Sequence, residues 1–199
     1  MAAVCALNNR SRIIYNDEKA EFQIQGEPTE AALKVFAEKL GNYADHVTRN
    51  NAKVSPMHHA DVLEKSVQRV ATLDFTSERK SSSSVVTGYN GNQGNTVLLK
   101  GAYEGVLRKC NTVLNSHGQA QPLTEAQTNN LLTKIQDVSG KGYRVLGIAV
   151  GLDGGNMKDI TADNAHDLLA NASDYDKYES NLSFVGYVCI KDPARPEVK

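Results

Sequence analysis

One aromatic residue and four cations stand at or near the ends of the apolar segments of this sequence. They are Phe75, Arg79, Lys80, Lys100 and Arg144. An aromatic ring at the edge of a strand can stack on a nucleobase, and lysine or arginine beside it can contact phosphates. Each residue taken alone is better explained as a solvated charge at a strand end or as a core phenylalanine. Taken together, they suggest a nucleotide site.

The stretch LLKGAYEGVLRKC (98–110) holds one of these cations in a distinctive setting. Lys100 ends an apolar run and is followed directly by Gly101. A strand that ends in lysine and turns through glycine into a short helix can present a cation beside free backbone N–H groups. Many proteins bind phosphate in this way. The same arrangement is also a common way to end a strand, so the stretch leaves both interpretations open.

Residue spacing argues against three other kinds of site. The segment SGKGYR (139–144) has Gly142 where a Walker-type loop requires a serine or threonine to hold magnesium. No Gly-x-Ser-x-Gly elbow occurs. The histidines and cysteines lack the clustered spacing of a metal site. We therefore expect no P-loop, no serine hydrolase and no bound metal ion.

The composition is that of an ordinary soluble protein. The 199 residues are 40% hydrophobic and 23% charged, with a formal net charge of −1, so the clustered basic excess of a nucleic-acid binder is missing. The longest apolar run, LSFVGYVCI (182–190), has the length of a buried strand and not of a membrane span. Three scattered cysteines favour a reducing compartment. We expect a cytosolic domain that contacts neither nucleic acid nor the membrane directly.

Capping signals and helical spacing of apolar residues predict the helices. GEPTEAALKVFAEKLG (26–41) has Pro28 in its first turn and Gly41 as its terminator. TEAQTNNLLTKIQDVSG (124–140) has Thr124 and Gln127 at capping-box spacing. GAYEGVLRKC (101–110) indicates a short helix, and a further helix is expected near 160–171. The polar segment 41–60 is expected to be a surface linker.

Alternating apolar and polar residues, with many β-branched side chains, predict five strands. They lie within residues 67–77, 83–89, 95–100, 143–151 and 182–190. NGNQGN (90–95) is rich in residues that tolerate positive φ, which favours a hairpin at this point. Consecutive strands joined by hairpins favour an antiparallel sheet with helices packed on it. We expect one α+β domain over residues 1–199, built on a twisted antiparallel sheet flanked by helices.

Four segments resemble the nucleotide-binding (N) domain of P-type ATPases, and most closely that of the calcium pumps of the sarcoplasmic and endoplasmic reticulum. They are GEPTEAAL (26–33), DFTSERKSSSSVV (74–86), LLKGAYEGVL (98–107) and LSFVGYVCIKDPARPEV (182–198). Their order and spacing agree from Val4 to Val198. The pairing of Lys-Gly-Ala-x-Glu with an upstream Phe-x-x-x-Arg-Lys-Ser is specific to that family.

The resemblance implies an ATP site and a role for each of its residues. Phe75 matches the aromatic that stacks on adenine, and Glu30 matches the acidic residue that meets the adenine amino group. Lys100 and Gly101 border the adenosine. Lys80 matches the lysine beside the base and phosphates. In the same way, the resemblance places Arg144 at the phosphates or ribose.

Two positions depart from the family pattern. Ser77 stands where calcium pumps often have an arginine two residues after the stacking aromatic, so either one phosphate contact is missing or Arg79 partly replaces it. Tyr103 stands where the family has a proline after Lys-Gly-Ala. We expect this second change to alter the turn locally and to leave Lys100 in place.

The phosphorylation motif of the family, Asp-Lys-Thr-Gly-Thr, does not occur in this sequence. The resemblance therefore implies a domain that holds Mg-ATP by its adenosine end and presents the γ-phosphate to an aspartate elsewhere in a pump. Segments 1–4 and 191–199 are expected to be hinges toward the phosphorylation domain, with the actuator domain as a second partner. Alone, the domain is expected to be a monomer that binds ATP weakly and hydrolyses none.

The same resemblance implies a cellular location and leaves two alternative functions open. The domain is expected at the cytosolic face of the endoplasmic reticulum membrane, with Mg²⁺ carried by the nucleotide and coordinated outside the domain. The N domain of another type II pump, for sodium, protons or manganese, is one alternative. A degenerate, non-catalytic nucleotide-binding or interaction module is another, because Ser77 and Tyr103 both depart from the pattern.

Overall fold

The computed structural model describes residues 1–41 and 56–191, and these form two sheets. The larger sheet has seven strands in the order β3-β4-β5-β8-β9-β6-β7. Its strands are β3 (Gln68–Leu73), β4 (Ser81–Thr87), β5 (Thr96–Ala102), β6 (Cys110–Leu114), β7 (Ala120–Pro122), β8 (Tyr143–Gly151) and β9 (Leu182–Lys191). The smaller sheet is a hairpin of β1 (Arg12–Asn16) and β2 (Glu21–Gln25).

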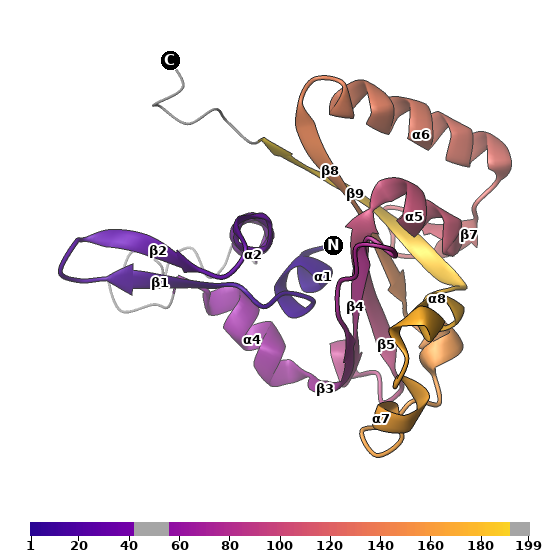
Figure 1. Ribbon diagram of the computed structural model, residues 1–199, viewed down its shortest axis with the longest axis horizontal. Coiled ribbons are helices and arrows are strands. Elements are labelled where there is room, and N and C mark those ends of the chain that lie inside the picture. The colour runs from indigo at the N-terminus through magenta and orange to yellow at the C-terminus, as the bar shows by residue number, and fades with distance from the viewer. Residues whose placement is uncertain (42–55, 192–199) are drawn as a thin grey trace.

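Helices cover both faces of the larger sheet (Figure 1). One face packs against α1 (Ala2–Leu7), α2 (Pro28–Leu40) and α4 (His58–Ser66). The other face carries α5 (Tyr103–Arg108), α6 (Glu125–Ser139), α7 (Ala165–Leu168) and α8 (Tyr175–Tyr178). Single 3₁₀ turns lie at Tyr89–Gly91, Gly155–Met157 and Ala172–Asp174. The α+β fold class predicted from the sequence is confirmed.

Alternation along the central strands divides the core into two layers. In β5, Leu98 contributes to the core under α1, α2 and α4, while its neighbours Val97 and Leu99 contribute to the core under α5 and α6. Lys100 follows the period of Leu98 and lies on the α2 face, where its main chain pairs with Ser82 of β4. The strand period therefore places the side chain of Lys100 near the first turn of α2.

The predicted helices and strands agree closely with the structure. Thr124 caps α6 through a complete capping box with Gln127, and α2 has Pro28 at its first position. The predicted hairpin is present, because β4 and β5 pair antiparallel on either side of the turn at Tyr89–Gly91. The expected helix near 160–171 is only the four residues of α7.

The larger sheet is antiparallel, as predicted, except that β6 pairs parallel with β9. The prediction also missed β6 and β7 altogether. The segment 41–60 is not all linker: α4 begins at His58, while residues 42–55 lie outside the described part of the chain. No described helix combines the length and apolar character that crossing a bilayer would require.

The N-terminal residues contribute to the core. Ala3 to Leu7 of α1 are buried beneath α2 and the sheet, and the chain then leaves through the loop Asn8–Ser11 into the β1–β2 hairpin. Figure 1 shows this hairpin extending away from the larger sheet, next to α2 and α4. Of the two expected hinge segments, residues 2–4 start α1, and residues 192–199 lie outside the described part of the chain.

Candidate nucleotide site

Buried Lys100 and half-buried Glu30 form the centre of the candidate site. Lys100 Nζ lies 2.8 Å from Glu30 Oε1, and the two side chains are 7% and 26% exposed. The same ammonium group also donates to the main-chain oxygen of Asn8. The other carboxylate oxygen, Oε2, accepts the main-chain N–H of Arg10 at 2.8 Å. Residues 70 positions apart in the sequence are thus held together by the fold.

The environment shifts the pKa of both groups. Burial alone raises the pKa of Glu30, but the hydrogen bond and charge of Lys100, with Arg10 adding to them, outweigh burial and hold this pKa below its usual value. For Lys100, burial is the strongest influence and lowers the pKa, although Glu30 acts in the opposite direction. With its pKa held below the usual value, Glu30 remains a carboxylate at neutral pH despite its partial burial, and it can accept a hydrogen bond from an amino group.

Phe75 lies just beyond the end of β3 and is largely open to solvent. Its side chain is 61% exposed, whereas Leu73, two residues earlier on the strand, is fully buried. The strand predicted within residues 67–77 ends at Leu73, two residues before Phe75. The ring of Phe75 is therefore free of the core and available to stack on a planar ligand.

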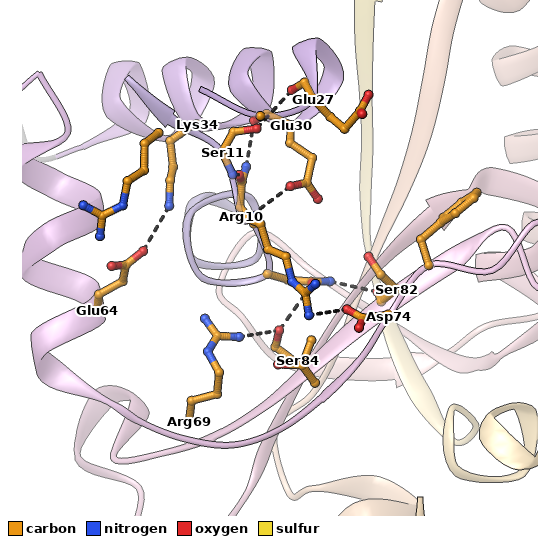
Figure 2. Close-up of a pocket in the computed structure, with 16 residues that line it drawn as sticks. Arg10, Ser11, Glu27, Glu30, Lys34, Glu64, Arg69, Asp74, Ser82 and Ser84 are labelled. Atoms are coloured by element: carbon orange, nitrogen blue, oxygen red, sulfur yellow. Dashed lines mark hydrogen bonds and ion pairs between the residues drawn. The ribbon is translucent and has the colours of Figure 1, made fainter. Parts of the chain in front are cut away.

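A cavity of about 790 Å³ lies between α2, the loop Asn8–Ser11 and strands β3 and β4. Glu30 and Phe75 both line it, and its volume falls within the range of small-molecule sites. Four cations and four carboxylates contribute to its wall: Arg10, Arg12, Lys34, Arg69, Glu27, Glu30, Glu64 and Asp74. Two pairs neutralise one another, Lys34 with Glu64 and Arg10 with Asp74 (Figure 2).

Lys80 and Gly101 meet through their main chains at the edge of the site. Lys80 closes a turn, with its N–H bonded to the Thr76 oxygen at 2.7 Å and its φ at +52°, in the left-handed region. The β5 backbone passes directly beneath: a Cβ at position 101 would lie 2.6 Å from the Lys80 oxygen. Glycine at this position therefore permits the close approach, and the Lys80 side chain itself is exposed.

Arg144 opens β8 at the side of α2. Its Nη1 donates to Thr29 Oγ1 at 2.5 Å, and Thr29 directly precedes Glu30 in the first turn of α2. Arg144 and Lys80 do not line the cavity, and neither does Lys100, which lies behind Glu30 and Asn8. The structure thus brings Glu30, Lys100 and Arg144 to one end of α2. It places only Glu30 and Phe75 directly on the cavity wall.

Arg79 is unsuited to the phosphate contact suggested for it from the sequence. Its guanidinium is buried on the opposite side of β4 from Ser82, where Nε lies 3.0 Å from Glu179 Oε2. It also donates to the main-chain oxygens of Asp74 and Ser81 and lies 4.7 Å from the ring centre of Tyr175. The expectation that Arg79 partly replaces the arginine missing at position 77 is therefore corrected. Its side chain holds the turn that precedes β4.

Two residues that were not predicted from the sequence contact this site. The main-chain oxygen of Asn8 accepts a hydrogen bond from the Lys100 ammonium group, and Arg10 contacts both Glu30 and Asp74. The only local signal is an abrupt change from the apolar run AAVCAL to the polar run NNRSR. Within residues 1–41 and 56–191, no group of three or more histidines, cysteines or carboxylates is placed to hold a metal ion.

The fold and this site define an α+β domain in which an exposed aromatic residue and a carboxylate paired with a lysine line one cavity. Residues 1–197 match the family model described as "P-type ATPase, cytoplasmic domain N". The chain belongs to this family, and the resemblance read from its four segments is confirmed.

Three relatives match the whole chain. The chain is 34% identical to calcium-transporting ATPase 2, endoplasmic reticulum-type, of Arabidopsis thaliana, and 32% identical to calcium-transporting ATPase 4 of that type from the same plant. It is 33% identical to the endoplasmic reticulum calcium ATPase srcA of Aspergillus fumigatus. The chain spans about a fifth of the length of these relatives, 19% of the plant proteins and 20% of the fungal one.

Proposed function

We propose that this chain is the ATP-binding domain of a calcium-transporting P-type ATPase and that it holds Mg-ATP by the adenosine end. The observation that carries the proposal is the shared cavity wall of Phe75 and Glu30, with the Glu30 carboxylate held ionised by Lys100. An exposed aromatic face suits any base, and a fixed hydrogen-bond acceptor suits the adenine amino group. Lys80, Lys100, Gly101 and Arg144 remain proposed nucleotide contacts around these two.

The domain's share of phosphoryl transfer would be positioning. Phosphoryl transfer depends mainly on bringing the reacting groups together and on stabilising charge. We propose that this domain carries the γ-phosphate to an aspartate in the phosphorylation domain of the same parent protein, with the actuator domain as a further partner. Magnesium would travel with the nucleotide and be coordinated outside this domain. The names of the relatives support calcium as the ion and the endoplasmic reticulum as the membrane.

An ATP titration of this chain followed by backbone-amide NMR tests the proposal, with AMP titrated in parallel. We expect saturable shifts grouped at Glu30, Phe75, Lys80, Lys100 and Arg144. The affinity should be weak, because residues 1–199 do not include the phosphorylation motif Asp-Lys-Thr-Gly-Thr. Similar shifts with AMP are expected because the adenosine end provides the anchoring contacts. The absence of shifts at millimolar ATP would contradict ATP binding by this chain. It would favour the degenerate-module alternative, for which Ser77 and Tyr103 are the sequence evidence.

Glu30→Gln is expected to narrow the preference for ATP over GTP by about five- to tenfold, the value of one hydrogen bond. A glutamine amide can donate as well as accept, so it can serve the guanine carbonyl that a carboxylate repels. The measurement is the ratio of the two dissociation constants. Glu27→Gln is the matched control, because Glu27 lines the same cavity and precedes α2. An unchanged ratio in Glu30→Gln would exclude the role of Glu30 in reading the base.

A further inference from the structure

The loop Asn8–Ser11 between α1 and β1 contacts α2 and β5, the elements that carry Glu30 and Lys100. The Asn8 amide donates to the main-chain oxygens of Ser82 and Leu98 at 2.8 and 3.1 Å, so the loop is fixed to β4 and β5. Asn9 Nδ2 donates to the main-chain oxygen of Glu30 at 2.7 Å. Ser11 Oγ donates to the Glu27 oxygen just before α2 at 3.0 Å. The loop therefore joins α2 to the sheet on the cavity side.

Arg10 is the member of this loop that contacts both Glu30 and Asp74, the residue that precedes Phe75. Its main-chain N–H donates to Glu30 Oε2 at 2.8 Å, and its Nη2 lies 2.5 Å from Asp74 Oδ1. Asp74 is the residue directly before Phe75, at the point where β3 has ended. Figure 2 shows Arg10 between Glu30 on the helix side and Asp74 on the strand side.

We propose that Arg10 is a positioning residue for nucleotide binding: its ion pair with Asp74 fixes the segment that carries Phe75 at the cavity, opposite Glu30. This inference rests on the proposed function. Pairing within β3 does not restrain this segment, because Phe75 lies two residues beyond the end of the strand and its ring is exposed. Arg79 holds the same segment from the opposite face, through the Asp74 main-chain oxygen. Arg10 holds it from the cavity face.

The expected effect is modest and sensitive to salt. The Arg10 and Asp74 side chains are 71% and 61% exposed, and exposed ion pairs contribute little and are screened. We expect Arg10→Ala to weaken ATP binding about two- to fivefold at low salt. The difference from the unmodified chain should shrink at high salt. The substitution keeps the main-chain N–H to Glu30, so the ratio of ATP to GTP affinity should not change.

Binding of adenosine, which has no phosphate, distinguishes a positioning role of Arg10 from direct contact with phosphate. If Arg10 positions Phe75, Arg10→Ala weakens adenosine and ATP binding by the same factor. The double replacement Arg10→Asp with Asp74→Arg, which restores an ion pair of opposite polarity, should recover affinity for both. Arg12→Ala is the control, because Arg12 lines the same cavity and makes no side-chain ion pair or hydrogen bond with the described residues. It should leave both affinities unchanged.

The outcomes are distinct for the two proposals. A loss confined to ATP, with adenosine unaffected, would overturn positioning and make Arg10 a phosphate contact. Equal losses of affinity in Arg10→Ala and Arg12→Ala would mean that any positive charge at the cavity has the same effect. That result would overturn the inference. Normal ATP binding by both variants would do the same while leaving the proposed function intact. Failure of the unmodified chain to bind adenosine or ATP would overturn the proposed function, and the inference with it.

Discussion

Glu179→Ala is expected to lower the free energy of unfolding by about 3 to 5 kcal/mol, because it removes one partner of a buried ion pair. Glu179 is fully buried and Arg79 is 3% exposed. The carboxylate also accepts the hydroxyls of Ser81 and Ser83, at 3.2 and 2.7 Å, and lies 3.1 Å from Lys109 Nζ. Alanine would leave the Arg79 charge buried beside unsatisfied hydroxyls. Chemical denaturation monitored by circular dichroism gives the measurement.

Two further variants isolate the cause of that loss. Glu179→Gln keeps the shape and an acceptor but not the charge, so its loss should be smaller. Asp174→Ala removes an exposed ion pair with Lys177 on a nearby turn and should barely change stability. If Glu179→Ala were as stable as the unmodified chain, the buried guanidinium of Arg79 would not require Glu179 for its stabilisation, and the prediction would be wrong.

This buried pair is linked to the proposed nucleotide site through the turn between Thr76 and Lys80. Arg79 fixes the turn to β4 and to Glu179. Lys80 at the end of the turn has an exposed side chain, and its main chain is in the left-handed region. With Ser77 in place of an arginine, Lys80 is the cation this segment can offer to a phosphate. The turn thus buries one of two adjacent cations, Arg79, and leaves the other, Lys80, exposed.

The sequence predicted the helices whose ends are marked by capping residues or proline within a single turn. The capping box at Thr124 and the proline at position 28 set where α6 and α2 begin, because those signals act within one helical turn. The parallel pairing of β6 with β9 joins segments about 70 residues apart, and no local pattern carries it. Helix α1 is six residues long and buried nearly throughout, so it has no polar face to give it a helical period.

The site was predictable in part for the same reason. The position of Phe75 at a strand end follows from the polar run TSERK behind it. The functions of Arg79 and Lys80 could not be separated, since the two cations are adjacent and the buried partner, Glu179, lies 100 residues away from Arg79. The contact of Lys100 with Asn8 likewise depends on how α1 packs under the sheet.

Phe75→Ala is expected to weaken ATP binding by about tenfold or more, because stacking of one base on an aromatic side chain contributes roughly 1–3 kcal/mol. The melting temperature should stay nearly unchanged, since the ring is 61% exposed and removing it leaves no cavity in the core. The loss should be similar for ATP and AMP, because the ring meets the base and not the phosphates. Isothermal titration and thermal unfolding of the same samples give both quantities.

Phe22→Ala provides a matched control for that variant. Phe22 is 66% exposed, but it lies on the β1–β2 hairpin, where it packs against Tyr15 with ring centres 5.1 Å apart. It does not line the cavity, so its removal should leave ATP affinity unchanged. A fall in stability of Phe75→Ala without a loss of affinity would make Phe75 a packing residue. A selective loss of affinity would instead place the base against Phe75, within reach of the carboxylate that Lys100 keeps ionised.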